Sequence, residues 1–94
     1  MVSKDISGDV PTLYVYLLTQ SVTCGHDTYN SCVVIAIDEE EARLIHPRGY
    51  TDAFNYSTSW VSLEDIHSIK VTKLGIATTN QVPGTVVCAS YRSG

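Results

Sequence analysis

Two apolar stretches, LYVYLL at residues 13–18 and CVVIAI at residues 32–37, decide the fold. Both consist of β-branched, aromatic and aliphatic residues, which is the composition of buried strands. Because both faces of the first stretch are apolar, it should form a central strand that is covered on both sides, or on one side by another subunit, and the second stretch should form another buried strand. The polar residues 20–31 between them, centred on Gly25, are expected to form a loop.

A short helix is expected directly after the second of these strands. Asp38 is followed three residues later by Glu41, which is the spacing of a capping box, and the acidic residues between them suit the positive end of a helix dipole. Pro47 and Gly49 should end this helix, which we place at residues 39–46. A helix of this length can cover only part of one sheet face.

The rest of the chain predicts two more strands. Residues 68–72 alternate between polar and apolar side chains, and the alternation changes phase near Gly75, which indicates a β-bulge. The last strand is expected at 85–91, after a turn closed by Pro83 and Gly84. Between the helix and these strands we expect a polar loop at 48–58, a short edge strand at 60–61 and a capped turn at 62–65.

The order strand, strand, helix, strand, strand predicts an α+β fold with a four-stranded, mainly antiparallel sheet. The 94 residues suffice for one domain, which we place at 12–94, behind a flexible lead-in at 1–11. One short helix leaves apolar residues of the second sheet face uncovered. We therefore expect a homodimer or a larger homo-oligomer.

The composition argues against several classes of protein. Hydrophobic residues make up 44% of the chain and charged residues 17%, which is a globular rather than a disordered composition. The formal net charge is −4 and the six Lys and Arg residues are scattered, so direct binding to nucleic acid is not expected. An acidic balance of this kind suits a partner protein whose own surface is basic.

The lack of a recognisable targeting signal and the odd number of cysteines favour the cytoplasm. No stretch approaches the roughly 20 apolar residues that span a membrane, so no membrane contact is expected, and residues 1–8 contain no apolar signal core. Three cysteines without a signal peptide argue against a disulfide framework. We expect Cys24 to be a loop thiol, and Cys32 and Cys88 to be small buried residues.

Two groups of polar and aromatic residues are candidate binding sites. The first lies between the two strong strands and contains His26, Asp27, Tyr29 and Asn30. This segment is either a recognition loop or a turn in which Asp27 and Asn30 bond the local backbone.

The second candidate group surrounds the end of the expected helix. An arginine beside aromatic rings offers a bidentate clamp and a stacking face, which suit a ligand with both phosphate and base. The alternative is that the helix arginine pairs with Glu39 or Glu40, and that His46 caps the helix C-terminus. The members of the group are Arg43, His46, Arg48, Tyr50 and Tyr56, and Asn55 of the same loop is a further candidate binding residue.

Catalytic and metal chemistry have weaker support. Cys24, His26 and Cys32 lack a regular zinc spacing, and no fourth ligand lies nearby in the sequence. No helix N-terminus lies beside Cys24 to activate it as a nucleophile. We therefore expect no enzyme activity, no metal and no cofactor, and we place the function in the loops at 25–30 and 46–56.

Four stretches carry a resemblance to a known family. They are YLLTQ at 16–20, GHDTYNSCVV at 25–34, EEARLIHP at 40–47 and GTVVCASY at 84–91, with WV at 60–61 and VxxLG at 71–75 between them. Together they resemble a family of small proteins encoded by bacteriophages and prophages, over most of the chain from residue 13. The family pattern has Tyr at position 26 and Asp at position 30, so the resemblance implies no catalytic role for His26.

The resemblance implies a phage or prophage genome, and hence action in the cytoplasm of a bacterial host. Small phage proteins of this size are frequently inhibitors of bacterial immunity. The leading expectation is an anti-CRISPR-like inhibitor that binds a host defence protein stoichiometrically. The alternatives are an oligomeric sponge that sequesters a cyclic or ADP-ribose-type nucleotide signal and, with less support, a small enzyme or a structural virion protein.

Overall fold

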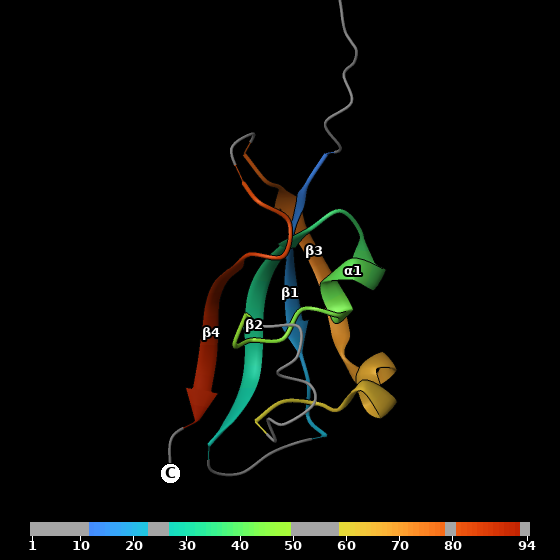
Figure 1. Ribbon diagram of the computed structural model, residues 1–94, viewed down its shortest axis with the longest axis vertical. Coiled ribbons are helices and arrows are strands. Elements are labelled where there is room, and N and C mark those ends of the chain that lie inside the picture. Colours follow the sequence, from blue (N-terminus) through green and yellow to red (C-terminus); the bar gives the residue numbers. More distant parts are fainter. Residues whose placement is uncertain (1–11, 23–26, 50–58, 79–80, 93–94) are drawn as a thin grey trace, which may run out of the picture.

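The computed structural model describes residues 12–22, 27–49, 59–78 and 81–92, which form a four-stranded antiparallel sheet with helical elements beside it (Figure 1). The strands are β1 (Tyr14–Thr19), β2 (Thr28–Ala36), β3 (Lys70–Ile76) and β4 (Val86–Arg92). Their order is β3-β1-β2-β4, so the β1–β2 hairpin forms the centre and the two later strands join its edges. The expected fold class, with one short helix after the second strand, is confirmed.

The central strand β1 explains why its sequence is apolar on both sides. Tyr16 and Leu18 point into the core and are 2% and 0% exposed. Val15 and Leu17 alternate with them, so they lie on the opposite face, where they are half-buried. We call the core side of the sheet the inner face and the side that carries Val15 and Leu17 the outer face.

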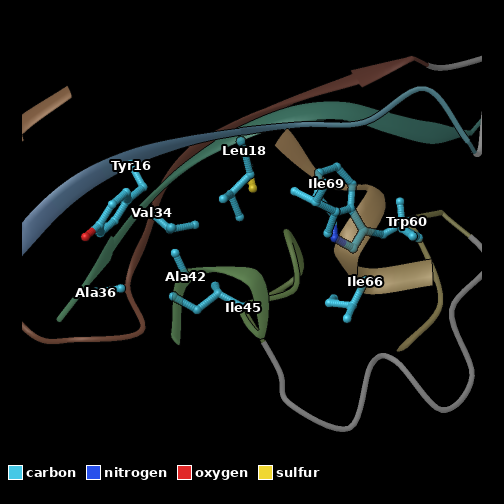
Figure 2. Packing of buried hydrophobic residues seen from close by; sticks show 11 residues of the cluster. Tyr16, Leu18, Val34, Ala36, Ala42, Ile45, Trp60, Ile66 and Ile69 are labelled. Carbon is cyan, nitrogen blue, oxygen red and sulfur yellow. The ribbon is translucent and has the colours of Figure 1, made fainter. Parts of the chain in front are cut away.

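The core lies between the inner face and a layer made of α1 (Glu39–Arg43), the segment behind it and the 3₁₀ helix η2 (Leu63–Ser68) (Figure 2). Burying these side chains on one side of a sheet is what holds so small a domain together. The sheet contributes Tyr16, Leu18, Cys32, Val34 and Ala36 to this core, and the second layer contributes Ala42, Ile45, Trp60, Val61, Ile66 and Ile69.

The helix α1 begins as the capping box predicts but ends earlier than expected. Asp38 Oδ1 accepts a hydrogen bond from the Glu41 backbone N–H at 2.8 Å, and Glu41 Oε1 accepts one from the Ile37 N–H at 3.0 Å. The predicted end at residue 46 was wrong. After Arg43, the N–H groups of Leu44 and Ile45 each donate three residues back at 3.1 Å, and this tightened turn carries Ile45 into the core.

Replacing the capping residue by Asp38→Ala is expected to lower the free energy of unfolding by about 1 kcal/mol, because a helix N–H loses its acceptor. Urea unfolding monitored by circular dichroism measures this loss. Glu64→Ala on the exposed side of η2 is the matched control and should change stability by less than about 0.5 kcal/mol. Equal stabilities of the two variants would show that the capping bond does not hold α1.

Strand β2 begins at Thr28, within the segment that was expected to be a loop, so the expected loop boundary at residue 31 was wrong. Polar side chains are tolerated there because the backbone finds partners on both sides. Thr28 pairs with Arg92 of β4, and the Gln20 side chain donates to the Tyr29 carbonyl at 2.7 Å. Thr28 and Tyr29 themselves favour a strand, and the pairing overrides the weak strand propensity of Asn30.

Three smaller expectations also needed correction. Trp60 and Val61 do not form an edge strand, because both are buried against the inner face. The turn expected at 62–65 is the longer helix η2, and the side chain of Ser62 makes no capping bond to it. Cys88 is exposed rather than buried, because β4 is an edge strand.

Two further features agree with the sequence. The pairing of β1 with β3 shifts register between Val15 and Tyr16, which face Gly75 and Lys73, so the bulge expected near Gly75 is confirmed. The turn before β4 contains Gly84 with φ of 91°, a backbone conformation that glycine adopts without strain. The lead-in at 1–11 and most of the loop at 48–58 lie outside the described residues.

Candidate functional site

Strand β2 begins and strand β4 ends at the same end of the sheet (Figure 1). A pair of tyrosine rings lies there. Tyr29 of β2 faces Tyr91 of β4 in the strand register, and their ring centroids are 4.7 Å apart with the planes tilted by 60°. Such cross-strand aromatic pairs stabilise a sheet and hold both rings in one orientation. Tyr29 also packs against the core, whereas Tyr91 is 43% exposed.

Asp27, the residue directly before β2, is joined to the end of β4 by a hydrogen bond. The Tyr91 hydroxyl donates a hydrogen bond to Asp27 Oδ1 at 3.3 Å. The backbone of Asp27 has φ of 61°, in the left-handed region that is unusual for residues other than glycine and that Asp tolerates better than most. A strained backbone conformation at an exposed polar residue is typical of binding and catalytic sites.

The charge of Arg48 acts on the hydroxyl of Tyr91. The loss of solvent around Tyr91, followed by the charge of Asp27 and the hydrogen bond to it, raises the pKa of Tyr91, while the positive charge of Arg48 acts in the opposite direction. Both charged side chains therefore lie within electrostatic reach of one phenol. We name Asp27, Tyr29, Arg48 and Tyr91 the tyrosine cluster.

A buried histidine holds the backbone turn that contains Arg48. His46 is 1% exposed, and its Nδ1 accepts a hydrogen bond from the Arg48 backbone N–H at 3.1 Å. Its carbonyl accepts another from the Gly49 N–H at 2.8 Å. The expectation that His46 caps the helix C-terminus was therefore wrong: the ring is inside the protein and fixes the backbone that carries Arg48.

The structure unites one part of each predicted binding group. Asp27 and Tyr29 of the first group contact Tyr91, which neither group contained, and Arg48 of the second group acts on the pKa of Tyr91 through its charge. Tyr91 was missed because it follows the strand alternation and gave no local sign of a site. Only the register between β2 and β4 reveals its neighbours.

The other predicted residues do not join the cluster. Asn30 is exposed in β2, where its carbonyl accepts a hydrogen bond from the Gln20 N–H at 3.2 Å, so the turn that was considered for it is not formed. Arg43 is half-buried on α1, and no ion pair joins it to Glu39 or Glu40 among the described residues. His26, Tyr50, Asn55 and Tyr56 lie outside the described residues.

A second surface feature lies at the start of α1. An open hollow of about 540 Å³ is lined by Tyr14, Tyr16, Ile37, Asp38, Glu39, Glu40 and Lys73. The Lys73 ammonium is 3.9 Å from the centroid of the Tyr14 ring, which is the geometry of a cation–π contact. Burial, followed by the charges of Asp38 and Glu39, raises the pKa of Tyr16, so this phenol stays neutral.

The remaining groups with altered acidity belong to the core. Burial raises the pKa of the Cys32 thiol to about 12, which keeps it protonated and unreactive. Burial, with a smaller contribution from Arg48, lowers the pKa of His46 to about 4. Within the described ranges, no group of three His, Cys, Asp or Glu side chains is arranged to hold a metal ion, and no helix is long and apolar enough to cross a membrane.

Comparison with family models, with curated proteins and with solved structures found no match to this chain.

Proposed function

We propose that this domain binds a protein partner stoichiometrically through the tyrosine cluster, without catalysing a reaction. The observation that supports this is the exposed Tyr91 ring, held by Tyr29 and Asp27 with Arg48 in reach. Tyrosine and arginine are the residues that most often supply the binding energy of interfaces. Rings that are already held in place lose little conformational entropy when a partner binds.

The class of partner follows from the resemblance to phage proteins and from charge. We propose a bacterial antiviral-defence protein, such as a CRISPR effector, as the target in the cytoplasm of the host. Nucleases that bind nucleic acid have basic surfaces, and they would be attracted by a domain of net charge −4. The acidic side chains around the hollow at Asp38, Glu39 and Glu40 add to this attraction.

The test is a plating assay on bacteria with active CRISPR immunity, followed by calorimetry with the purified effector. Expression of the protein should restore plating of the targeted phage. Tyr91→Ala and Arg48→Ala should each weaken binding to the effector, the tyrosine variant by about 30-fold, which corresponds to about 2 kcal/mol. Circular dichroism establishes that each variant is folded.

Leu63→Ala provides the control, because this side chain is exposed on η2 and belongs to neither the cluster nor the hollow. It should bind as tightly as the parent protein. If folded Tyr91→Ala and Arg48→Ala variants also bind as the parent does, the tyrosine cluster is not the interface. If the protein restores no plating against any type of defence tested, the proposed class of partner is wrong.

A nucleotide sponge is the second candidate, because the charge of Arg48 acts on the phenol of Tyr91, whose ring packs against Tyr29. A guanidinium and a ring together suit a phosphate and a base. Mass spectrometry of the molecules released by denaturing protein purified from cells with an active immune signal would reveal such a ligand. In that case Arg48→Ala should cause the larger loss and binding should weaken steeply with salt, whereas a protein partner should depend more on Tyr91.

A further inference from the structure

The two edges of the sheet differ in how they are protected from other strands. The β3 edge carries Lys70 and Lys73, both exposed, and its pairing is interrupted by the register shift beside Gly75. Lysines and bulges are the usual means by which an edge strand avoids pairing with another chain. The β4 edge has neither a lysine nor any other charged residue from Val86 to Tyr91.

The β4 edge is also fully accessible. Every residue from Val87 to Tyr91 is exposed. The pairing with β2 has two register shifts: one lies between Val33 and Val34, before Cys88, and the other lies between Tyr29 and Ser31, opposite the step from Ser90 to Tyr91. From Cys88 to Ser90 the strand pairs regularly with β2, one residue to one residue. The extra residue of this second shift, Asn30, belongs to β2, so the outer side of β4 stays an uncharged strand edge, which is a template for a further strand.

The direction of the backbone groups on this edge follows from the ladder. Ile35 donates its N–H to the Thr85 carbonyl at 2.9 Å and accepts from the Gly84 N–H at 2.8 Å, so its groups point toward β4. Directions alternate along an antiparallel strand, so Val33 and Ser31 also point toward β4, and their partners Cys88 and Ser90 point back. Ala89 lies between Cys88 and Ser90, and Tyr91 follows Ser90. The backbone groups of Ala89 and Tyr91 therefore point away from β2, toward the open edge.

We propose that β4 pairs antiparallel with β4 of a second copy of this chain, about a twofold axis at Ser90. In this register Ala89 and Tyr91, whose backbone groups point outward, face Tyr91 and Ala89 of the second copy. A small side chain thus meets a large one on the same face, and the two copies of Ser90 meet at the axis, where cross-strand serines pair favourably. The four-stranded sheets of the two copies would then form one continuous sheet of eight strands.

A second copy fits this edge better than an unrelated strand for two reasons. The stretch 89–91 pairs with itself about Ser90, and no like charges face each other there, because Arg92 faces Cys88. The other edge is blocked by Lys70 and Lys73, so the pairing closes at two copies instead of extending into a fibre. The homo-oligomer expected from the apolar face of β1 is thereby assigned to a different surface, and this inference does not depend on the proposed partner.

The experiment uses opposite charges at the twofold axis. The parent protein should sediment at twice the 10.3 kDa of one chain. Ser90→Lys and Ser90→Glu, each alone, place like charges face to face and should weaken association by about tenfold or more. An equimolar mixture of the two variants should associate again, because each lysine then faces a glutamate. Thr72→Lys, on the β3 edge, is the control and should leave association unchanged.

A disulfide test complements the charge test, because a covalent bond captures the dimer even where association is weak. Side chains that face each other at a non-hydrogen-bonded pair are close enough for a disulfide, so Ser90→Cys in a Cys88→Ser background should form a covalent dimer under mild oxidation. Thr72→Cys in the same background should not. The proposal is overturned if the parent protein sediments only as a single chain at about 100 μM, if either charged variant remains as tightly associated as the parent, or if the mixed variants fail to associate.

Discussion

Leu18→Ala is expected to lower the free energy of unfolding by about 3 kcal/mol. Leu18 is 0% exposed at the centre of β1, and it faces Cys32 on one neighbouring strand and Val71 on the other. Truncation removes buried methyl groups and leaves a cavity that the rigid sheet cannot close. Domains of this size have a total stability of about 5–15 kcal/mol, so the variant should show a large shift of its urea midpoint.

Leu17→Ala is the matched control, which tests whether the loss in Leu18→Ala comes from the inner face of the sheet. Leu17 lies on the same strand and has the same size, but it points to the outer face and is half-buried. It should cost about 1 kcal/mol, since less apolar surface is withdrawn from water. Equal losses for the two variants would show that the outer face is as well covered in solution as the core.

The stability of the domain should fall by about 2 kcal/mol between about pH 7.5 and about pH 5, owing to His46. The pKa of His46 is lowered to about 4 in the folded protein, while the unfolded chain has the ordinary value of 6.5. Between these values the unfolded state binds a proton that the folded state does not. The loss of stability is therefore absent above about pH 7.5, grows as the pH falls through 6.5, and levels off below about pH 4.

His46→Asn tests the assignment, because an asparagine oxygen can accept the Arg48 N–H in place of Nδ1 but does not titrate. In urea unfolding at both pH values, this variant should lose most of the pH dependence that the parent shows. His67→Asn is the matched control, since His67 is exposed at the end of η2 and its removal should leave the dependence intact. A steep dependence that survives His46→Asn would assign the effect to other groups.

The fold could be predicted from the sequence because its main determinants are local. The apolar stretches of β1 and β2 are short and rich in β-branched or aromatic residues, which favours buried strands, and the spacing of Asp38 and Glu41 indicates the start of α1. The end of α1 could not be predicted, because it depends on where Ile45 and His46 find space in the core rather than on Pro47. Helix boundaries that are set by packing leave no mark in the local pattern.

The candidate site was predicted only in part, for a related reason. Asp27, Tyr29 and Arg48 stood out as polar and aromatic residues in expected loops, but nothing in the sequence placed them together. The register of β2 with β4 brings Tyr91, near the other end of the sequence, against Asp27 and Tyr29, and the charge of Arg48 acts on its pKa. Register is a property of the pair of strands, so a single strand does not reveal it.

The strand order β3-β1-β2-β4 also has a consequence for the kinetics of folding. The hairpin of β1 and β2 closes over a short connection, whereas β4 can reach β2 only after most of the chain has been brought together. Closing the longer loop costs more entropy, and folds dominated by such distant contacts reach the native state in milliseconds to seconds. Until β4 docks, the edge of β2 at Val33 and Ile35 is open, so the chain is most prone to misassembly in that interval.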